Sequence, residues 1–269
     1  MFIIRVVTAI AGLLYLSLMF YIGGWFFNFS VLIITLVATR ELYGAFLKKG
    51  FKPMVWLGFL LVLISFYLML FESAGYTWIY ILLVVLFSLA IPILIPSVRF
   101  LDSLLTIFGG IYPGLALLSM IPLAHHAQPY TTHLLVVTFY ASWATDAFAY
   151  ITGTLFGKTK LSPQISPNKT VEGSLGGVAG SIIVGLSIAY VINIVSPIDL
   201  VFYHYAIISL LCGIVSQIGD LAASSIKRFC RVKDFGNILP GHGGILDRFD
   251  SVIFTVPMVY AYYLIFLAP

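Results

Sequence analysis

The chain has 269 residues, of which 61% are hydrophobic and only 9% are charged, and its formal net charge is +4. Its mean hydropathy of +1.08 lies far outside the range of soluble globular domains. This composition excludes a soluble protein and predicts a polytopic α-helical membrane protein. No segment alternates with period two, as the strands of a membrane β-barrel do.

Nine apolar runs are long enough for transmembrane helices, because a helix needs about 20 mostly apolar residues to cross the hydrocarbon core. They lie at residues 2–22, 25–47, 54–71, 76–96, 103–123, 131–156, 174–195, 201–226 and 251–267. We therefore expect an all-α fold with about nine transmembrane helices. The first run ends in FYIGGWFF, which lacks a small-residue cleavage pattern, so we expect a retained helix rather than a signal peptide.

The basic residues are distributed unevenly among the connections between these runs. Apart from Arg5 and Arg40, the Lys and Arg residues lie in or beside alternate connections: Lys48, Lys49, Lys52, Arg99, Lys158, Lys160, Lys169, Lys227, Arg228, Arg231, Lys233 and Arg248. The positive-inside rule places these connections and the N-terminus in the cytoplasm, and Pro269 on the opposite side. The same bias explains the net charge, so no nucleic-acid partner is predicted.

The first half of the chain, residues 1–130, contains few polar side chains and is predicted to be a scaffold of transmembrane helices. Arg40, Glu41 and Asp102 lie near the ends of predicted helices, where we expect them to reach lipid headgroups. Residues 131–269 contain polar groups inside or beside the apolar runs. They are predicted to form the catalytic transmembrane region, with a polar site that faces the cytoplasm.

The run at 131–156 contains ASWATDAFAYITGTLFGK, which places Asp146 well inside a membrane segment. A carboxylate costs at least a few kcal/mol in the bilayer unless it is paired, hydrated or bound to a cation. Asp146 is therefore a candidate for an ion site or a polar cavity. The alternative is a structural carboxylate, hydrogen-bonded to neighbouring Ser, Thr or Tyr side chains.

The next connection, GKTKLSPQISPNKTVEG at residues 157–173, offers Ser166, Lys169, Thr170 and Glu172 close to the start of a helix. The free N–H groups of a helix N-terminus favour phosphate. This segment is either a phosphate-binding connection or an ordinary cytoplasmic loop with a capping Ser or Thr.

The helix that follows carries a stripe of small residues four positions apart, at Gly173, Gly177, Ser181 and Gly185. Such a stripe permits close approach of a second helix. It is predicted to pack either within one chain or between two chains, and it is therefore compatible with a homodimer.

The run at 201–226 and its continuation place Asp220, Ser224, Lys227 and Arg231 at offsets of 0, 4, 7 and 11. On a helix of 3.6 residues per turn, these offsets put all four side chains on one stripe. The alternative is a buried Asp220 neutralised by a snorkelling Lys227, with a structural role only.

Residues 227–250 read KRFCRVKDFGNILPGHGGILDRFD and contain eight of the 24 charged residues. Asp247 and Asp250 either bind a ligand or cap the following helix. His242 is a candidate general base, hydrogen-bond donor to phosphate, or turn residue. GHGG is predicted to offer free backbone N–H groups to an anion. Carboxylates suit a hard cation such as Mg²⁺, and Lys and Arg suit phosphate, so this set favours phosphoryl or nucleotidyl transfer.

SSIKR, then KD, then LPGHGGILDRFD follow one another over residues 224–250. This segment resembles the phosphatidate cytidylyltransferase (CDP-diacylglycerol synthase) family, whose pattern is S-x-[aliphatic]-K-R, four residues, K-D and then P-x-H-G-G-x-x-D-R-x-D. The chain shows no departure from it. SPNKTVEG and DAFAY…FGK are also similar to the family, so the resemblance covers residues 146–250.

The resemblance implies that the chain transfers a cytidylyl group from CTP to phosphatidic acid, giving CDP-diacylglycerol and pyrophosphate in phospholipid biosynthesis, with Mg²⁺ and room for a second cation. A lipid phosphate oxygen would attack the α-phosphorus of CTP. The implied catalytic residues are Lys227, Arg228, Asp247 and Arg248; the implied substrate-binding residues are Ser166, Lys169, Thr170, Glu172, Ser224 and His242; and the implied metal ligands are Asp220, Asp247 and Asp146. By the same resemblance, the protein is expected in a bacterial plasma membrane, with its site on the cytoplasmic face.

Two other classes remain as alternatives. A related lipid kinase would release a nucleoside diphosphate instead of pyrophosphate. An ion-coupled transporter would use Asp146 and Asp220 along its pathway. A CDP-alcohol phosphotransferase is disfavoured, because its D-G-x-x-A-R pattern does not occur in the chain.

Overall fold

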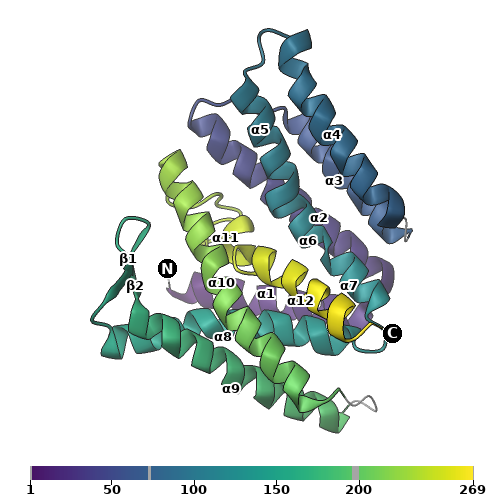
Figure 1. Cartoon of the computed structure of the whole chain (residues 1–269). Coiled ribbons are helices and arrows are strands. Elements are labelled where there is room, and N and C mark those ends of the chain that lie inside the picture. The colour runs from purple at the N-terminus through teal and green to yellow at the C-terminus, as the bar shows by residue number, and fades with distance from the viewer. Residues whose placement is uncertain (1, 72–73, 196–199, 269) are drawn as a thin grey trace. The chain divides into compact units, whose positions relative to one another are not determined.

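The computed structural model describes residues 2–71, 74–195 and 200–268. Helices form most of the structure, and two short strands pair in one sheet (Figure 1). The elements are α1 (Phe2–Ile22), α2 (Gly24–Lys48), α3 (Val55–Leu70), α4 (Ala74–Leu94), α5 (Phe100–Gly109), η1 (Gly110–Leu115), α6 (Ala116–Leu118), α7 (Met120–His126), α8 (Thr131–Phe156), β1 (Lys160–Ser162), β2 (Ser166–Thr170), α9 (Val171–Val195), α10 (Phe202–Cys230), α11 (Leu246–Phe249) and α12 (Val252–Phe266).

Each predicted apolar run coincides with helical structure in the described ranges, and α5, η1, α6 and α7 form one helical segment. Among the described residues, five helices are long and apolar enough to cross a membrane: Gly24–Lys48, Phe100–His126, Thr131–Phe156, Val171–Val195 and Phe202–Cys230. Shorter apolar helices lie at Val6–Ile22, Val55–Leu70, Trp78–Leu94 and Val252–Phe266. The all-α membrane class is confirmed, whereas the number of nine spans and their orientation remain predictions.

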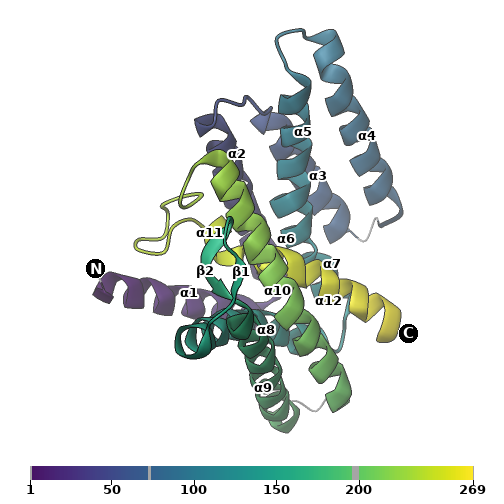
Figure 2. The same ribbon diagram turned by 60° about the vertical axis from the view of Figure 1, so that its left-hand side comes forward.

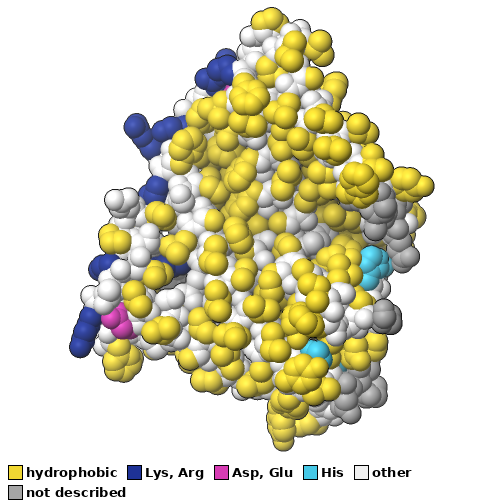
Figure 3. Space-filling model, in the orientation of Figure 1, with side chains coloured by type: hydrophobic (Ala, Val, Ile, Leu, Met, Phe, Trp, Pro, Cys, Tyr) yellow, Lys and Arg dark blue, Asp and Glu magenta, His cyan; other side chains and the backbone are white. Residues whose placement is uncertain are grey.

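Apolar side chains are abundant on the surface as well as in the core. Figure 3 shows hydrophobic side chains over most of the visible face. Trp25, Trp56 and Trp78 are each exposed over more than half of their surface, at 59%, 62% and 61%. Soluble monomers rarely expose contiguous apolar patches larger than a few hundred Å², so this surface suits lipid rather than water.

The structure divides into two compact units, each formed from two segments of the chain. The first contains Met1–Pro122 and Lys227–Phe249, and the second contains Leu123–Ile226 and Asp250–Pro269. Most of α10 therefore belongs to the second unit and its last turn to the first. The functional division into a scaffold at 1–130 and a catalytic region at 131–269 remains a prediction.

In the first unit, α2 packs closely against α3 and α5 at glycines. The ring of Tyr43 occupies the space that a Cβ on Gly58 or Gly109 would need, and its hydroxyl donates to the carbonyl oxygen of Thr106 at 2.6 Å. Small residues allow this approach between helices. Beyond Gly109 the helix widens into η1, which contains Pro113, a residue without an N–H for the helical ladder.

Asp102, at the start of α5, is buried rather than directed toward headgroups. It is 1% exposed, accepts a hydrogen bond from the backbone N–H of Lys52 at 2.7 Å, and pairs with Arg99 at 2.8 Å. The hydrogen bonds that Arg99 donates to the Asp102 carboxylate raise the pKa of its guanidinium. The expectation that Asp102 reaches lipid headgroups is therefore wrong, because the carboxylate instead holds the connection between α2 and α3.

The last turn of α10 is attached to the first unit by aromatic contacts. Phe229 stacks on Phe51 with ring centroids 5.7 Å apart, and the ammonium of Lys49 lies 5.5 Å from the centroid of the Phe229 ring. Stacking and cation–π contacts of this kind stabilise partly exposed surfaces modestly. They fix the segment from which Lys227 and the following loop extend.

In the second unit, α8 and α9 lie side by side (Figures 1 and 2). A Cβ on Gly173 would lie 2.7 Å from the carbonyl oxygen of Ala149, and a Cβ on Gly177 would lie 2.9 Å from that of Thr145. The hydroxyl of Ser181 donates to the carbonyl oxygen of Ser209 on α10. The predicted small-residue stripe thus packs inside the chain, which removes the argument for a homodimer.

Between α8 and α9 the chain forms a β-hairpin where a loop was expected. Strands β1 and β2 pair antiparallel, with Lys160 opposite Thr170 and Ser162 opposite Ser166. The turn between them closes through a hydrogen bond of 3.3 Å from the N–H of Ile165 to the carbonyl oxygen of Ser162. Pro163 occupies the second position of this turn, where its fixed φ is favourable.

Candidate active site

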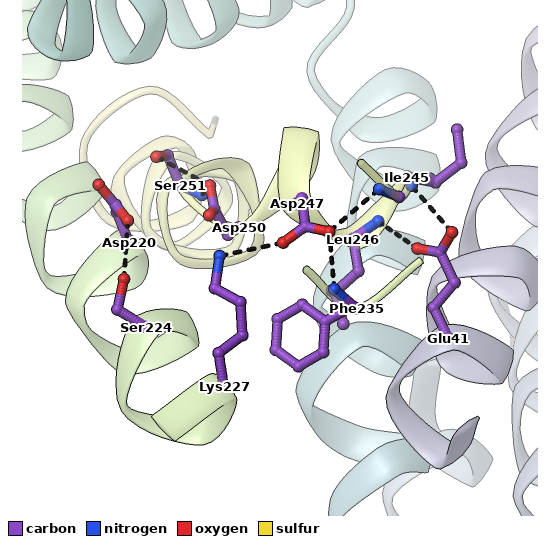
Figure 4. Close-up of polar contacts among 11 residues, drawn as sticks. Glu41, Asp220, Ser224, Lys227, Phe235, Ile245, Leu246, Asp247, Asp250 and Ser251 are labelled. Atoms are coloured by element: carbon purple, nitrogen blue, oxygen red, sulfur yellow. Dashed lines mark hydrogen bonds and ion pairs between the residues drawn. The ribbon is translucent and has the colours of Figure 1, made fainter. Parts of the chain in front are cut away.

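Asp247, at the start of α11, is buried and accepts hydrogen bonds at both carboxylate oxygens within the first unit (Figure 4). Its Oδ2 accepts from the backbone N–H groups of Phe235 at 2.8 Å and Gly244 at 3.0 Å. Its Oδ1 pairs with the ammonium of Lys227 at 3.0 Å. The two oxygens therefore have different partners: Oδ2 binds backbone N–H groups of the loop, and Oδ1 faces the Lys227 ammonium.

The turn before Asp247 needs its glycines. Gly241 and Gly243 have φ values of 76° and 83°, which L-residues with a Cβ rarely adopt. The N–H of His242 donates to the carbonyl oxygen of Leu239, and the N–H of Gly244 is taken by Asp247. The prediction of unobstructed N–H groups in GHGG is therefore wrong for His242 and Gly244.

A cavity of about 550 Å³ opens beside this turn in the first unit. It is lined by Lys233, Asp234, Gly236, Asn237, Leu239, Gly241, His242, Gly243 and Arg248. The Nδ1 atom of His242 is buried and has no hydrogen-bond partner among the described residues. A lysine and an arginine around one opening suit an anionic ligand.

Glu41 is a buried member of this region that the sequence did not reveal. It lies in α2, is 6% exposed, and accepts hydrogen bonds from the N–H groups of Ile245 at 3.1 Å and Leu246 at 2.8 Å. The expectation that it reaches headgroups is wrong, because these amides fix it inside the protein. The rule that singled out Asp146, a carboxylate inside an apolar run, would have found Glu41 as well.

In the second unit, the structure brings two of the predicted residues together. Lys169 on β2 forms an ion pair with Asp220 on α10, and the hydroxyl of Ser224 donates to the other oxygen of Asp220 at 3.4 Å. The Lys169 and Asp220 side chains are 26% and 24% exposed. The carboxylate is therefore in contact with solvent as well as with its lysine.

Asp146 and Asp250 converge on one hydroxyl, also within the second unit. The Oγ of Ser251 lies 3.4 Å from a carboxylate oxygen of each, and the N–H of Ser251 donates to Asp250 at 2.8 Å. A hydroxyl carries a single proton and cannot donate to both carboxylates at once. Asp250, for which the sequence predicts either ligand binding or helix capping, therefore lies at the same hydroxyl as Asp146.

The other predicted residues of the 157–173 connection shape the hairpin and the helix start. The Oγ1 of Thr170 accepts from the N–H of Gly173 at 3.1 Å, which is an N-cap of α9. Glu172 accepts from the N–H groups of Lys158 and Thr159 at 3.0 and 3.1 Å. Ser166 is half-buried in the hairpin. Substrate contact by these three residues remains a prediction.

The predicted stripe on α10 ends earlier than expected. Arg231 has a φ of 57°, its N–H donates to Arg228, and the N–H of Val232 donates to the carbonyl oxygen of Lys227 at 3.0 Å. This left-handed stop is a Schellman motif, in which glycine is usual. Arg231 therefore leaves the helix and is not on the stripe. Arg228 and Arg248 are both exposed.

Among the residues that the structure describes, no three His, Cys, Asp or Glu side chains are grouped to hold one metal ion. Mg²⁺ is nevertheless often held by one or two carboxylates together with substrate phosphates and water. Asp220 and Asp247 fit that chemistry, because each already directs one oxygen at a lysine ammonium.

Carboxylates beside lysines, in an apolar helical protein, suit a membrane enzyme that handles phosphate groups. The cytidylyltransferase family matches residues 3–266, and the chain belongs to that family. It is accordingly a nucleotidyltransferase.

Relatives from three bacteria are named phosphatidate cytidylyltransferase. The protein of Synechocystis sp. is 34% identical over 98% of this chain and 97% of its own length, and that of Staphylococcus haemolyticus is 33% identical over 95% and 96%. The protein of Bacillus subtilis is 47% identical over 129 residues, which are 47% of this chain and 46% of the relative. The resemblance seen in the sequence is confirmed, and neither the transporter nor the lipid kinase is supported.

Proposed function

We propose that the chain transfers the cytidylyl group of CTP to phosphatidic acid and releases pyrophosphate. The new bond joins a phosphate oxygen of the lipid to the α-phosphorus of CTP, and the bond to the bridging oxygen of the β-phosphate breaks. The observation that carries this proposal is the similarity, over nearly the whole chain, to relatives named phosphatidate cytidylyltransferase. The lipid phosphate is anionic at neutral pH, so no side chain is needed as a general base.

The residues of the first unit support this reaction by their charge. Lys227, now paired with Asp247, is in place to neutralise a phosphate oxygen when substrate arrives. Arg248 and His242 line the cavity of this unit and are proposed to bind the triphosphate of CTP. Arg228 follows Lys227 in the chain and is exposed. It is proposed to stabilise the negative charge that develops in the transition state.

The residues of the second unit are proposed to act on the same two substrates. Lys169 would bind a substrate phosphate after leaving Asp220, and Ser224 would keep the Asp220 carboxylate in place. Ser166 is proposed to contact substrate from β2, while Thr170 and Glu172 hold the hairpin that carries it.

By the same resemblance, Asp220 and Asp247 are each proposed as a ligand of a divalent cation, with Mg²⁺ as the proposed metal. Bound to the triphosphate, such an ion would stabilise charge on the leaving pyrophosphate. Asp146 and Asp250 converge on Ser251 and are proposed to hold a second cation. The protein is a multi-pass membrane protein, and we propose that it lies in the plasma membrane with the site facing the cytoplasm, because the positive-inside rule assigns the basic connections to that side.

The test uses purified protein in detergent with CTP, phosphatidic acid and Mg²⁺, and follows CDP-lipid and pyrophosphate together. We expect both products in equal amounts, and neither after EDTA until Mg²⁺ is restored. Release of CDP with a phosphorylated lipid would instead establish a kinase. Activity that persists in EDTA would overturn the cation assignment.

A further inference from the structure

Glu41 reaches a loop more than 200 positions later in the chain. Both of its carboxylate oxygens are used: Oε1 accepts from the N–H of Ile245 and Oε2 from the N–H of Leu246. These two amides immediately precede Asp247 in the chain. Figure 4 shows Glu41 approaching this stretch from α2.

The same side chain also contacts the other arm of the loop. A Cβ added to Gly236 or to Gly244 would overlap with the Glu41 carboxylate. Glu41 thus touches both the segment that follows Phe235 and the segment that precedes Asp247. The Oδ2 atom of Asp247 binds the N–H groups of the same two arms, at Phe235 and Gly244.

Two carboxylates therefore fix one loop. Glu41 and Oδ2 of Asp247 together use the backbone N–H groups of Phe235, Gly244, Ile245 and Leu246. With Oδ2 held in this way, Oδ1 is the oxygen that faces Lys227. If the arms separated, Asp247 would lose the two amides that distinguish its oxygens.

From these contacts we propose that Glu41 is a positioning residue for Asp247. Glu41 acts through the backbone of residues 244–246. In this way it sets the direction in which Oδ1 of Asp247 points, toward Lys227 or a bound cation. This inference rests on the proposed function, because it takes Asp247 as a site residue. A carboxylate is required, because two N–H donors face it and a glutamine offers only one acceptor oxygen.

The test compares Glu41→Gln with Asp102→Asn in the full-length protein in detergent. Asp102 is a matched control, because it is a buried carboxylate of the same unit that also accepts a backbone N–H, and its contacts lie in another loop. We expect Glu41→Gln to lower kcat at least about tenfold and to raise the Mg²⁺ concentration for half-maximal rate. Asp102→Asn should lower Tm at least as much but keep both constants per folded molecule.

A binding measurement separates positioning from a general loss of fold. Affinity for CTP with Mg²⁺ is measured for the wild type, Glu41→Gln, Asp247→Asn and the double variant. If Glu41 acts through Asp247, the second substitution adds little to the first, whereas independent effects add. Should Glu41→Gln fail to fold, Glu41→Asp, which keeps the charge but is one methylene shorter, takes its place in the cycle.

Equal kinetics for Glu41→Gln and Asp102→Asn, or additive losses of binding, would overturn the inference and leave Glu41 a structural residue. An inactive wild type would instead remove the proposed function. The two failures are therefore distinguishable.

Discussion

Lys227 and Asp247 form a salt bridge of 3.0 Å in which both side chains are largely buried, with 13% and 2% of their surface exposed. The Lys227 ammonium also lies 5.5 Å from the centroid of the Phe235 ring, so it is held on two sides. Removing one partner of such a pair leaves an uncompensated charge, which costs far more than the pair itself contributes. The pair is a sensitive point for both stability and activity.

Asp247→Asn is expected to abolish turnover while the protein still inserts and folds. An asparagine has no charge to compensate the largely buried Lys227 ammonium, so about 3–5 kcal/mol of stability should be lost as well. CDP-lipid formation and Tm in detergent check both effects, with Asp102→Asn as the control for loss of a buried carboxylate. A folded Asp247→Asn protein that retains normal kcat would show that the carboxylate has no part in the reaction.

Lys169→Met is expected to raise KM about tenfold for the substrate whose phosphate Lys169 binds, with little loss of stability. Its ion pair with Asp220 is partly exposed, and such pairs contribute only about 0–1 kcal/mol, so the fold does not depend on it. A tenfold change in KM corresponds to about 1.4 kcal/mol of lost phosphate binding. Lys160→Met, on the neighbouring strand with an exposed side chain, is the control. Equal effects of the two variants on KM would refute a specific role for Lys169.

His242→Ala should change binding and stability in opposite directions. The buried Nδ1 atom has no partner among the described residues, and an unsatisfied buried polar atom costs about 1–3 kcal/mol. Removing the ring should therefore leave Tm unchanged or higher, while KM for CTP rises because the ligand loses a partner. Thermal unfolding and initial rates check both signs. A lower Tm with an unchanged KM would make His242 a turn residue only.

The sequence predicts the helical runs well, because apolar composition alone decides whether a segment can lie in a bilayer. It also identifies Asp247 and Lys227, since their neighbours form a motif that is continuous in the chain. The position of Glu41 inside an apolar run marks it as unusual, but its partners Ile245 and Leu246 are more than 200 positions away and cannot be read from the sequence. The sequence also does not predict where α10 ends, because a non-glycine residue, Arg231, adopts the left-handed conformation that terminates the helix.

The hairpin shows a different limit. The sequence predicts only a connection at Ser166 and Lys169, whereas the structure has strands of three and five residues there. Such short strands carry no useful alternation of polar and apolar residues. Only the folded structure shows that Lys169 on β2 forms an ion pair with Asp220.

Gly236→Ala is expected to reproduce part of the Glu41→Gln effect from the other side of the contact. A methyl group at residue 236 would overlap with the Glu41 carboxylate, so either the loop or the side chain must move. Gly44→Ala, on the same helix as Glu41, is the matched control, because nothing lies within 4 Å of its added Cβ. Alanine at that position should stabilise the helix by up to about 1 kcal/mol and leave the rate unchanged.

The two alanine variants are compared by kcat, by the Mg²⁺ concentration for half-maximal rate and by Tm. We expect Gly236→Ala to lower kcat about tenfold or more, since a displaced loop no longer directs Oδ1 of Asp247. If Gly236→Ala unfolds at the wild-type temperature with unchanged kinetics, the loop accommodates the methyl group without moving Asp247. The contact between Glu41 and residue 236 would then be irrelevant to the reaction, although the hydrogen bonds to Ile245 and Leu246 would still hold the other arm.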